Sequence, residues 1–144
     1  AGGVTQTGTF TMGKSLKARV QEELRKALEV LIRNKVELII CEYFRNIVEM
    51  EWAIEVALEY GLPVAATMCM GPGGDEAGVG VGECAVRMAK AGALLVGVNC
   101  LFDPFTCLEV LRSMKTALDA FELMPYLMAQ PLGYRYKLAT GRLP

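Results

Sequence analysis

The 144-residue sequence contains no histidine. This absence excludes, for this chain, Ser–His and Cys–His nucleophile pairs, the HExxH metalloprotease helix and imidazole metal ligands. Any general base in the chain must therefore be a carboxylate, a thiolate, a lysine or a tyrosine.

The sequence also lacks an excess of positive charge. Lys and Arg total 15 against 16 Asp and Glu, and the net charge is -1. Such a chain has no basic block that could neutralise a row of phosphates, so we expect no nucleic-acid partner. No apolar run approaches the ~20 residues needed to cross a bilayer, so we expect no membrane partner either.

Cysteines are present, but in an odd number and without a CxxC pair. The five are Cys41, Cys69, Cys84, Cys100 and Cys107. This pattern indicates neither a disulfide framework nor a self-contained zinc knuckle, and it favours a reducing, cytoplasmic setting.

Hydrophobic residues make up 53% of the chain, enough for a sizeable core, and they fall into two alternating patterns. Nearly continuous apolar runs, typical of parallel strands covered on both faces, occur at residues 36–42, 63–69, 94–100 and 126–130. Amphipathic helical patterns occur at residues 16–31, 47–58, 82–91 and 108–121. Asn46 with Glu49, and Thr106 with Glu109, have the spacing of capping boxes and predict two of the helix starts.

The strand ends at Glu42, Cys69, Cys100 and Gln130 are 27, 31 and 30 residues apart, as expected for repeated βα units. A doubly wound sheet is compatible with this order, but the regular period and the polar or thiol residue at each strand end favour a (β/α)8 TIM barrel. A full barrel needs ~250 residues, so these four units predict about half of one, incomplete at both ends. Residues 1–4 would then be the tail of an earlier strand.

Active sites of such barrels collect at the carboxyl ends of the strands. A carboxylate at the end of a buried strand is costly without a partner, so Glu42 either binds a substrate ammonium or simply emerges into solvent. Tyr43 either places its ring over the same mouth or packs against the barrel. Cys41 should face the opposite way, towards the helices, by strand alternation.

Two thiols follow the next strands along the chain. Cys100 lies beside Asn99 and Asp103, where a thiol is a metal ligand, a nucleophile or a small buried hydrophobe. Cys69 has a similar placement and the same alternatives. The glycine-rich segment 70–82 is expected to be a mobile loop over the barrel mouth, with phosphate binding as the weaker alternative.

Four strings in the sequence resemble the betaine-homocysteine S-methyltransferase family. They are Cys-Glu-Tyr-Phe at residues 41–44, Pro-Val-Ala-Ala-Thr-Met-Cys at 63–69, Gly-Glu-Cys-Ala-Val-Arg at 82–87, and Val-Asn-Cys at 98–100 with Phe-Asp-Pro at 102–104. The resemblance extends from residue 1 to about residue 134, and the wider homocysteine S-methyltransferase group shares the Val-Asn-Cys element.

This resemblance implies a barrel that holds Zn2+ by three cysteine thiolates. Cys100 matches one of them, and the other two form an adjacent Cys-Cys pair that does not occur in this sequence. Homocysteine is implied as the methyl acceptor, with Glu42 on its ammonium group and Asn99 lining its pocket. Tyr43 matches a tyrosine at the donor and metal site. The parent enzyme is expected to be a homo-oligomer.

Two departures from the family leave parts of the function open. Leu101 replaces the polar residue expected after the zinc cysteine in betaine-using members, so the methyl donor is betaine or S-methylmethionine. The tail 135–144 does not follow the family. We therefore expect a fragment of a zinc-dependent S-methyltransferase that is inactive alone; the alternative is a catalytically inactive half-barrel that self-associates or binds a partner.

Overall fold

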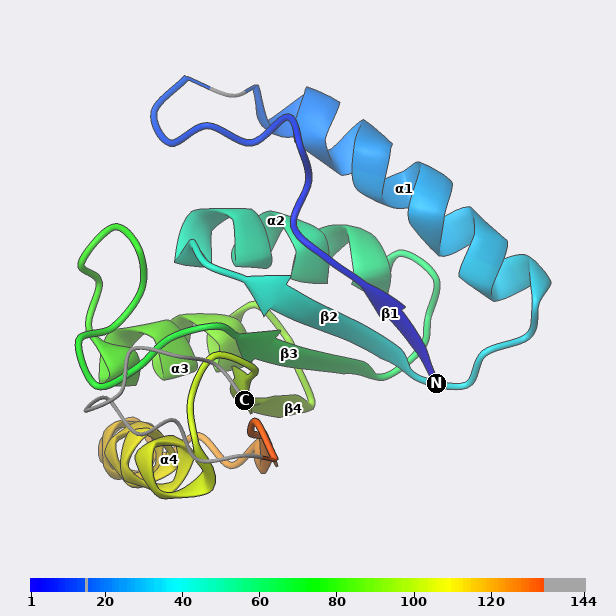
Figure 1. Ribbon diagram of the computed structural model, residues 1–144. Helices are drawn as coiled ribbons and strands as arrows, with labels where there is room; N and C mark the ends of the chain where they lie inside the picture. Colours follow the sequence, from blue (N-terminus) through cyan, green and yellow to red (C-terminus); the bar gives the residue numbers. More distant parts are fainter. Residues whose placement is uncertain (15, 134–144) are drawn as a thin grey trace.

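A computed structural model of the chain describes residues 1–14 and 16–133 (Figure 1). Strands and helices alternate along it, as β1 (Gly2–Val4), α1 (Lys17–Arg33), β2 (Ile39–Phe44), α2 (Ile47–Leu58), β3 (Val64–Met68), α3 (Val81–Lys90), β4 (Leu95–Asn99), α4 (Pro104–Ala120) and β5 (Tyr126–Gln130). None of the helices in these ranges is both long and apolar enough to cross a membrane.

The five strands form one sheet in the order β1-β2-β3-β4-β5, and every neighbouring pair is parallel. A doubly wound sheet reverses its strand order at a switch point, whereas a barrel wall adds each strand beside the previous one. The observed order is therefore that of part of a (β/α)8 barrel, as the sequence predicted.

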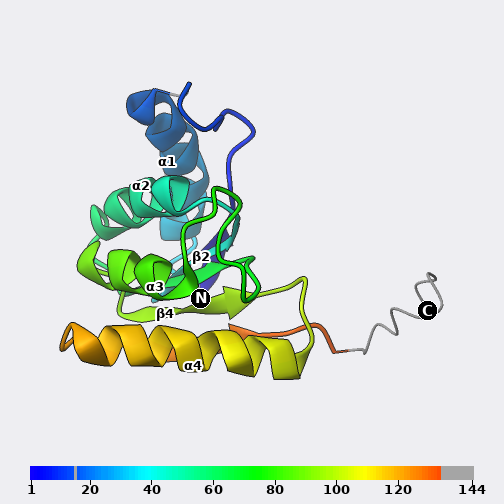
Figure 2. The ribbon, with the colours of Figure 1, turned by 90° about the vertical axis from the view of Figure 1, so that its left-hand side faces the viewer.

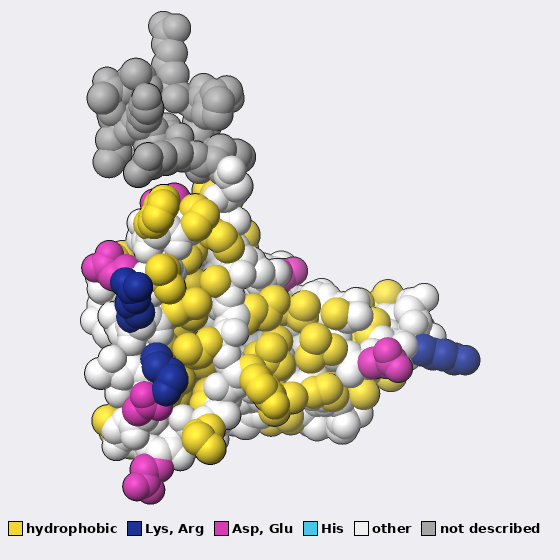
Figure 3. Space-filling view, turned by 90° about the horizontal axis from the view of Figure 1, so that it is seen from below, with side chains coloured by type: hydrophobic (Ala, Val, Ile, Leu, Met, Phe, Trp, Pro, Cys, Tyr) yellow, Lys and Arg dark blue, Asp and Glu magenta, His cyan; other side chains and the backbone are white. Residues whose placement is uncertain are grey.

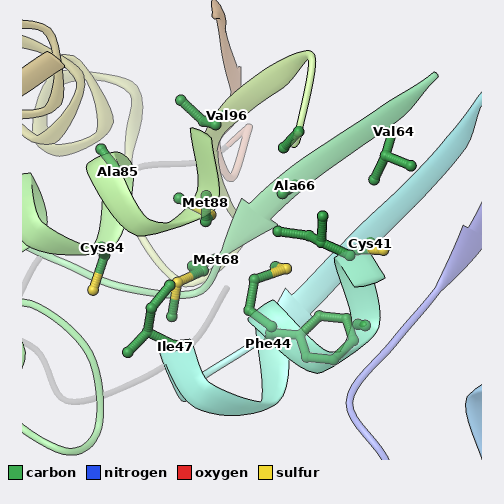
Figure 4. Close-up of a cluster of buried hydrophobic side chains, with 14 of the residues drawn as sticks. Cys41, Phe44, Ile47, Val64, Ala66, Met68, Cys84, Ala85, Met88 and Val96 are labelled. Carbon is green, nitrogen blue, oxygen red and sulfur yellow. The ribbon is translucent and has the colours of Figure 1, made fainter. Parts of the chain in front are cut away.

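All four helices cover one face of the sheet, because crossovers of the same hand between consecutive strands place every helix on the same side (Figure 2). Alternate strand positions point into this layer, among them Cys41, Ala66 and Val96, each fully buried. They pack against apolar residues of α2 and α3 such as Ile47 and Met88 (Figure 4). Cys41 thus faces the helices as predicted, and burial raises its pKa to about 12.

The start of α2 confirms the predicted cap, whereas the predicted start of α4 was wrong. Asn46 accepts a hydrogen bond from the Val48 backbone N–H at 2.9 Å. Helix α4 begins at Pro104, and its cap is Asp103, which accepts from the backbone N–H of Thr106 at 3.3 Å. The physical reason is that proline fixes φ for the first helical position and a carboxylate before it accepts the free amides.

Glu49, the predicted capping-box partner of Asn46, instead accepts hydrogen bonds from Thr7. Both the backbone N–H and the hydroxyl of Thr7 donate to Glu49 Oε1, at 2.7 and 2.8 Å. Burial is the largest influence on this carboxyl and raises its pKa, while the Thr7 hydrogen bonds act in the opposite direction. Glu49 therefore ties the β1–α1 loop to α2.

Strand β2 continues two residues past its predicted end at Glu42. Its pairing with β3 shifts between Cys41 and Phe44, so three steps along β2 match two along β3. This extra residue is a β-bulge, and Tyr43 within it has a φ of 64°. The bulge returns Phe44, fully buried, to the helix side.

Asp75 fastens the glycine-rich segment 70–82 to the start of α2. Its carboxylate accepts hydrogen bonds from the backbone N–H of Ile47 at 3.0 Å and from those of Ala77 and Val79 at 2.8 Å. An acid of the chain itself therefore occupies the amides that a phosphate would need, which argues against the phosphate alternative.

Gly97 supplies a stability test of the sheet. A Cβ added there would lie 1.8 Å from the Met128 backbone oxygen on β5, closer than any real contact. We expect Gly97→Ala to lower the free energy of unfolding by about 3 kcal/mol or more, measured by urea denaturation. Gly73→Ala, where a Cβ meets nothing within 4 Å, is the control. Equal stability of the two variants would contradict the β4–β5 packing.

Candidate functional site

The open face of the sheet carries polar side chains at the carboxyl ends of its central strands. Thr67 pairs in register with Gly97, and Asn99 pairs with Gln130. The Thr67 hydroxyl lies 3.4 Å from Gln130 Oε1, and this contact passes over Gly97, which has no side chain. The predicted meeting of strand ends at one mouth is thus present.

Asn99 is 1% exposed and its amide joins three strand ends. Its Oδ1 accepts from the Tyr43 backbone N–H at 3.2 Å and from the Cys69 thiol at 3.8 Å. Its Nδ2 donates to Cys100 Sγ at 3.3 Å. Because a backbone N–H only donates, the Tyr43 contact fixes which end of the amide faces Cys100.

Cys100 is the one thiol of the five that is not buried. Strand alternation alone would send its side chain towards the helices. Instead Cys100 and Leu101 adopt left-handed φ values of 57° and 58°, which turn the sulfur back to the Asn99 amide. The turn is closed by a 2.6 Å hydrogen bond from the Phe102 N–H to the Cys100 carbonyl. Such backbone costs about 1–2 kcal/mol per residue and clusters at functional sites.

Glu42 lies partly exposed on the open face, above β1. A Cβ on Gly3 would lie 2.7 Å from Glu42 Oε1, so the glycine makes room for the carboxylate. No Lys or Arg within the described part of the chain comes within salt-bridge distance of Glu42. The bulge leaves the neighbouring Tyr43 side chain 39% exposed.

The structure links the four predicted site residues unequally. Tyr43, Asn99 and Cys100 are joined directly by the Asn99 amide. Glu42 directly precedes Tyr43 on β2, and its charge is the smallest of the named contributions to the raised pKa of Cys69, about 12, which burial dominates. All four lie at the carboxyl ends of two strands, β2 and β4, on either side of β3.

Sequence patterns did not identify Arg45 as a site residue. It lines a hollow of about 230 Å³ together with Cys69, Leu101 and Phe102, and its charge acts to lower the pKa of the Cys69 thiol. Arg45 directly precedes the cap of α2, where the positive end of a helix disfavours a cation. This unfavourable placement of a cation is the sequence signal that could have identified Arg45.

The family model for homocysteine S-methyltransferase matches residues 1–142. The chain belongs to this family. Betaine–homocysteine S-methyltransferase 1 of Xenopus laevis is 52% identical over 134 residues, and that of Mus musculus is 50% identical. Each match covers 93% of this chain and 33% of the relative, so the chain spans about a third of their length.

Solved structures of the family show the same fold. The homocysteine methyltransferase MmuM of Escherichia coli in its apo form superposes with a TM-score of 0.64 at 14% identity, over 92% of this chain and 56% of that one. Its metallated form gives a TM-score of 0.61 at 13% identity, over 85% and 50%. The predicted fold class, part of a TIM barrel, is confirmed.

Within residues 1–14 and 16–133, no three His, Cys, Asp or Glu side chains are grouped so that they could hold a metal ion. The described residues could therefore offer a metal ion only separate ligands. Cys100 fits the role of a metal ligand, because its sulfur is partly exposed and is oriented by a hydrogen bond from Asn99 Nδ2. Cys69 fits poorly, because burial keeps it a thiol.

The role of Asn99 can be tested by removing its amide. We expect Asn99→Ala to lower the free energy of unfolding by about 2 kcal/mol, because the Tyr43 N–H loses its acceptor. Hydrogen exchange at the Tyr43 amide should accelerate in parallel. Asn34→Ala, which removes an exposed bond to the Val30 carbonyl, is the matched control. An unchanged Tyr43 exchange rate would show that Asn99 does not hold the bulge.

Proposed function

We propose that this chain contributes the homocysteine- and metal-binding part of a zinc-dependent S-methyltransferase. The parent enzyme would transfer a methyl group from betaine or S-methylmethionine to homocysteine, giving methionine. The observation that carries the proposal is the Cys100 sulfur, turned into the barrel mouth by a left-handed residue and held 3.3 Å from Asn99 Nδ2. The names of relatives at about half identity support it.

Cys100 would hold the zinc ion, and Asn99 Nδ2 would donate a hydrogen bond to the Cys100 sulfur. Zinc supplies one piece of chemistry, because a thiol bound to it loses its proton and becomes a nucleophilic thiolate at neutral pH. The remaining ligands would come from outside residues 1–14 and 16–133, and the Cys-Cys pair that the family uses does not occur in this sequence. The five free thiols favour a reducing, cytoplasmic setting for the proposed enzyme.

The mouth offers matching charges for an amino acid. Glu42 presents a carboxylate with no cation beside it in the described part of the chain, which suits the homocysteine ammonium. Arg45 lines the neighbouring hollow and suits a carboxylate. The exposed Tyr43 ring suits the cationic methyl donor, at about 0.5–2 kcal/mol per aromatic face.

The first test concerns the metal. In an active enzyme that contains this chain, Cys100→Ala should abolish both zinc binding and methionine formation, because it removes a thiolate ligand. Zinc is measured by atomic emission after gel filtration. Cys84→Ala, a buried thiol bonded to the Val79 carbonyl, should retain zinc. Stoichiometric zinc in Cys100→Ala would refute the proposed ligand.

The second test concerns the acceptor. Glu42→Gln should raise the Michaelis constant for homocysteine about tenfold or more while zinc content stays unchanged, because the ammonium loses its counter-charge. Glu37→Gln, an exposed carboxylate before β2, is the control. Comparing betaine with S-methylmethionine in the same assay decides the donor. An unchanged Michaelis constant would remove Glu42 from the acceptor site.

A second candidate function is association between copies of this half-barrel. The underside of the molecule gathers hydrophobic side chains over α4 and β5 (Figure 3). Met124 is 93% exposed and Tyr126 68% exposed, beside the edge of β5 that no strand of the described residues pairs with. Such a surface favours pairing with another copy. It would also serve the homo-oligomer expected of the parent enzyme.

The two candidates differ in what the 144-residue chain does alone. The methyltransferase proposal predicts no methionine formation, since the described residues group no three side chains that could hold a metal ion. The association proposal predicts a concentration-dependent dimer in sedimentation velocity that Met124→Glu weakens and Glu122→Gln does not. Methionine formed by the isolated chain would contradict the first expectation, and a monomer at every concentration would contradict the second.

A further inference from the structure

The ends of β3 and β4 bring two thiols together. Met68 pairs in register with Val98, so Cys69 lies opposite Asn99 and one residue of offset from Cys100. With strands about 4.8 Å apart and about 3.3 Å per residue, their Cα atoms are on the order of 6 Å apart. Disulfides span Cα separations of about 4.4–6.8 Å, so this spacing permits a bond.

Both side chains also point to the same amide. The Cys69 thiol donates to Asn99 Oδ1 at 3.8 Å, and the Cys100 sulfur accepts from Asn99 Nδ2 at 3.3 Å. The left-handed φ of Cys100 is what turns its sulfur to this side of the sheet. Because both sulfurs contact one amide, little movement would be needed to form an S–S bond between them.

The other three cysteines lack this arrangement. Cys41 is buried on the helix face. Cys84 and Cys107 contact the backbone carbonyls of Val79 and Phe102, at 3.6 and 3.7 Å. Cys100 is thus the thiol that solvent reaches, and Cys69, 6% exposed, is the thiol beside it.

We propose that Cys69 and Cys100 form a modification site at which a peroxide produces an intrachain disulfide. In the first step the Cys100 sulfur attacks hydrogen peroxide and the O–O bond breaks. Cys100 becomes a sulfenic acid, and one water is released. In the second step the Cys69 sulfur attacks the Cys100 sulfenic sulfur, an S–S bond forms, and the hydroxyl leaves as a second water with the thiol proton. Two electrons pass from the two thiols to the peroxide.

The disulfide would occupy the sulfur that the proposed function assigns to zinc, so oxidation would disable the metal site. The modification itself requires neither metal nor substrate. It can therefore be tested on the metal-free 144-residue chain, and a failed methyltransferase assay would leave its outcome unaffected.

The experiment treats the folded, metal-free chain with hydrogen peroxide, alkylates the remaining thiols and maps the product by tandem mass spectrometry. Before alkylation, we expect the product to be lighter than the reduced chain by two hydrogen atoms. It should contain a Cys69–Cys100 cross-link that a reductant reverses. Cys69→Ser should abolish the cross-link and accumulate Cys100 sulfenic acid, trapped by dimedone. Cys84→Ser and Cys107→Ser should form the cross-link as the unaltered chain does.

A second probe reports proximity without oxidation. A trivalent phenylarsenical bridges two neighbouring thiols, so the reduced chain should bind it and Cys69→Ser should not, with circular dichroism confirming that both are folded. A cross-link from Cys100 to Cys107, a cross-link that persists in Cys69→Ser, or oxidation of Cys100 to sulfinic acid with no disulfide would each overturn the proposal.

Discussion

The amide of Asn99 is the constraint on which the mouth of this half-barrel depends. It is nearly inaccessible to solvent, so its donor and acceptor must both be satisfied within the protein. It meets this need by accepting from the backbone of β2 and the thiol after β3 while donating to the thiol after β4. Left-handed backbone at Tyr43 and Cys100 is the cost of bringing those groups to it.

That cost is tolerable because the opposite face of the sheet is firmly packed. The extra residue of the β2 bulge shifts the pairing of β2 with β3 by one position. After the bulge, Phe44 is fully buried and returns the strand to the helix layer. On the open face, Gly3 and Gly97 leave room for neighbouring groups. The first leaves space for the Glu42 carboxylate, and the second allows β5 to approach and Thr67 to reach Gln130.

The sequence predicted the strands and helices to within a few residues, because the same burial that forms the core produces the apolar runs and the helical periodicity. Pro104 is the sequence signal of the true start of α4, whereas the capping-box spacing at Thr106 predicts a start that is too late. The bulge at Tyr43 was not predictable, since it depends on pairing with β3. Their places at strand ends singled out Glu42, Tyr43 and Cys100, and resemblance to the family added Asn99 and the expected roles. Only the fold shows that one amide joins Tyr43, Asn99 and Cys100.

The position of this cluster within the sheet determines what the half-barrel can do. The bonds of Asn99 all lie at the ends of β2, β3 and β4, which have neighbours on both sides, whereas β1 and β5 are the outermost strands of the described sheet. The thiol pair is therefore assembled without help from beyond the sheet. A tetrahedral metal site is different, because its ligands must surround the ion and a single wall presents them from one side only. One wall of a barrel can thus orient Cys100, whereas the proposed metal site would need further ligands from outside the described residues.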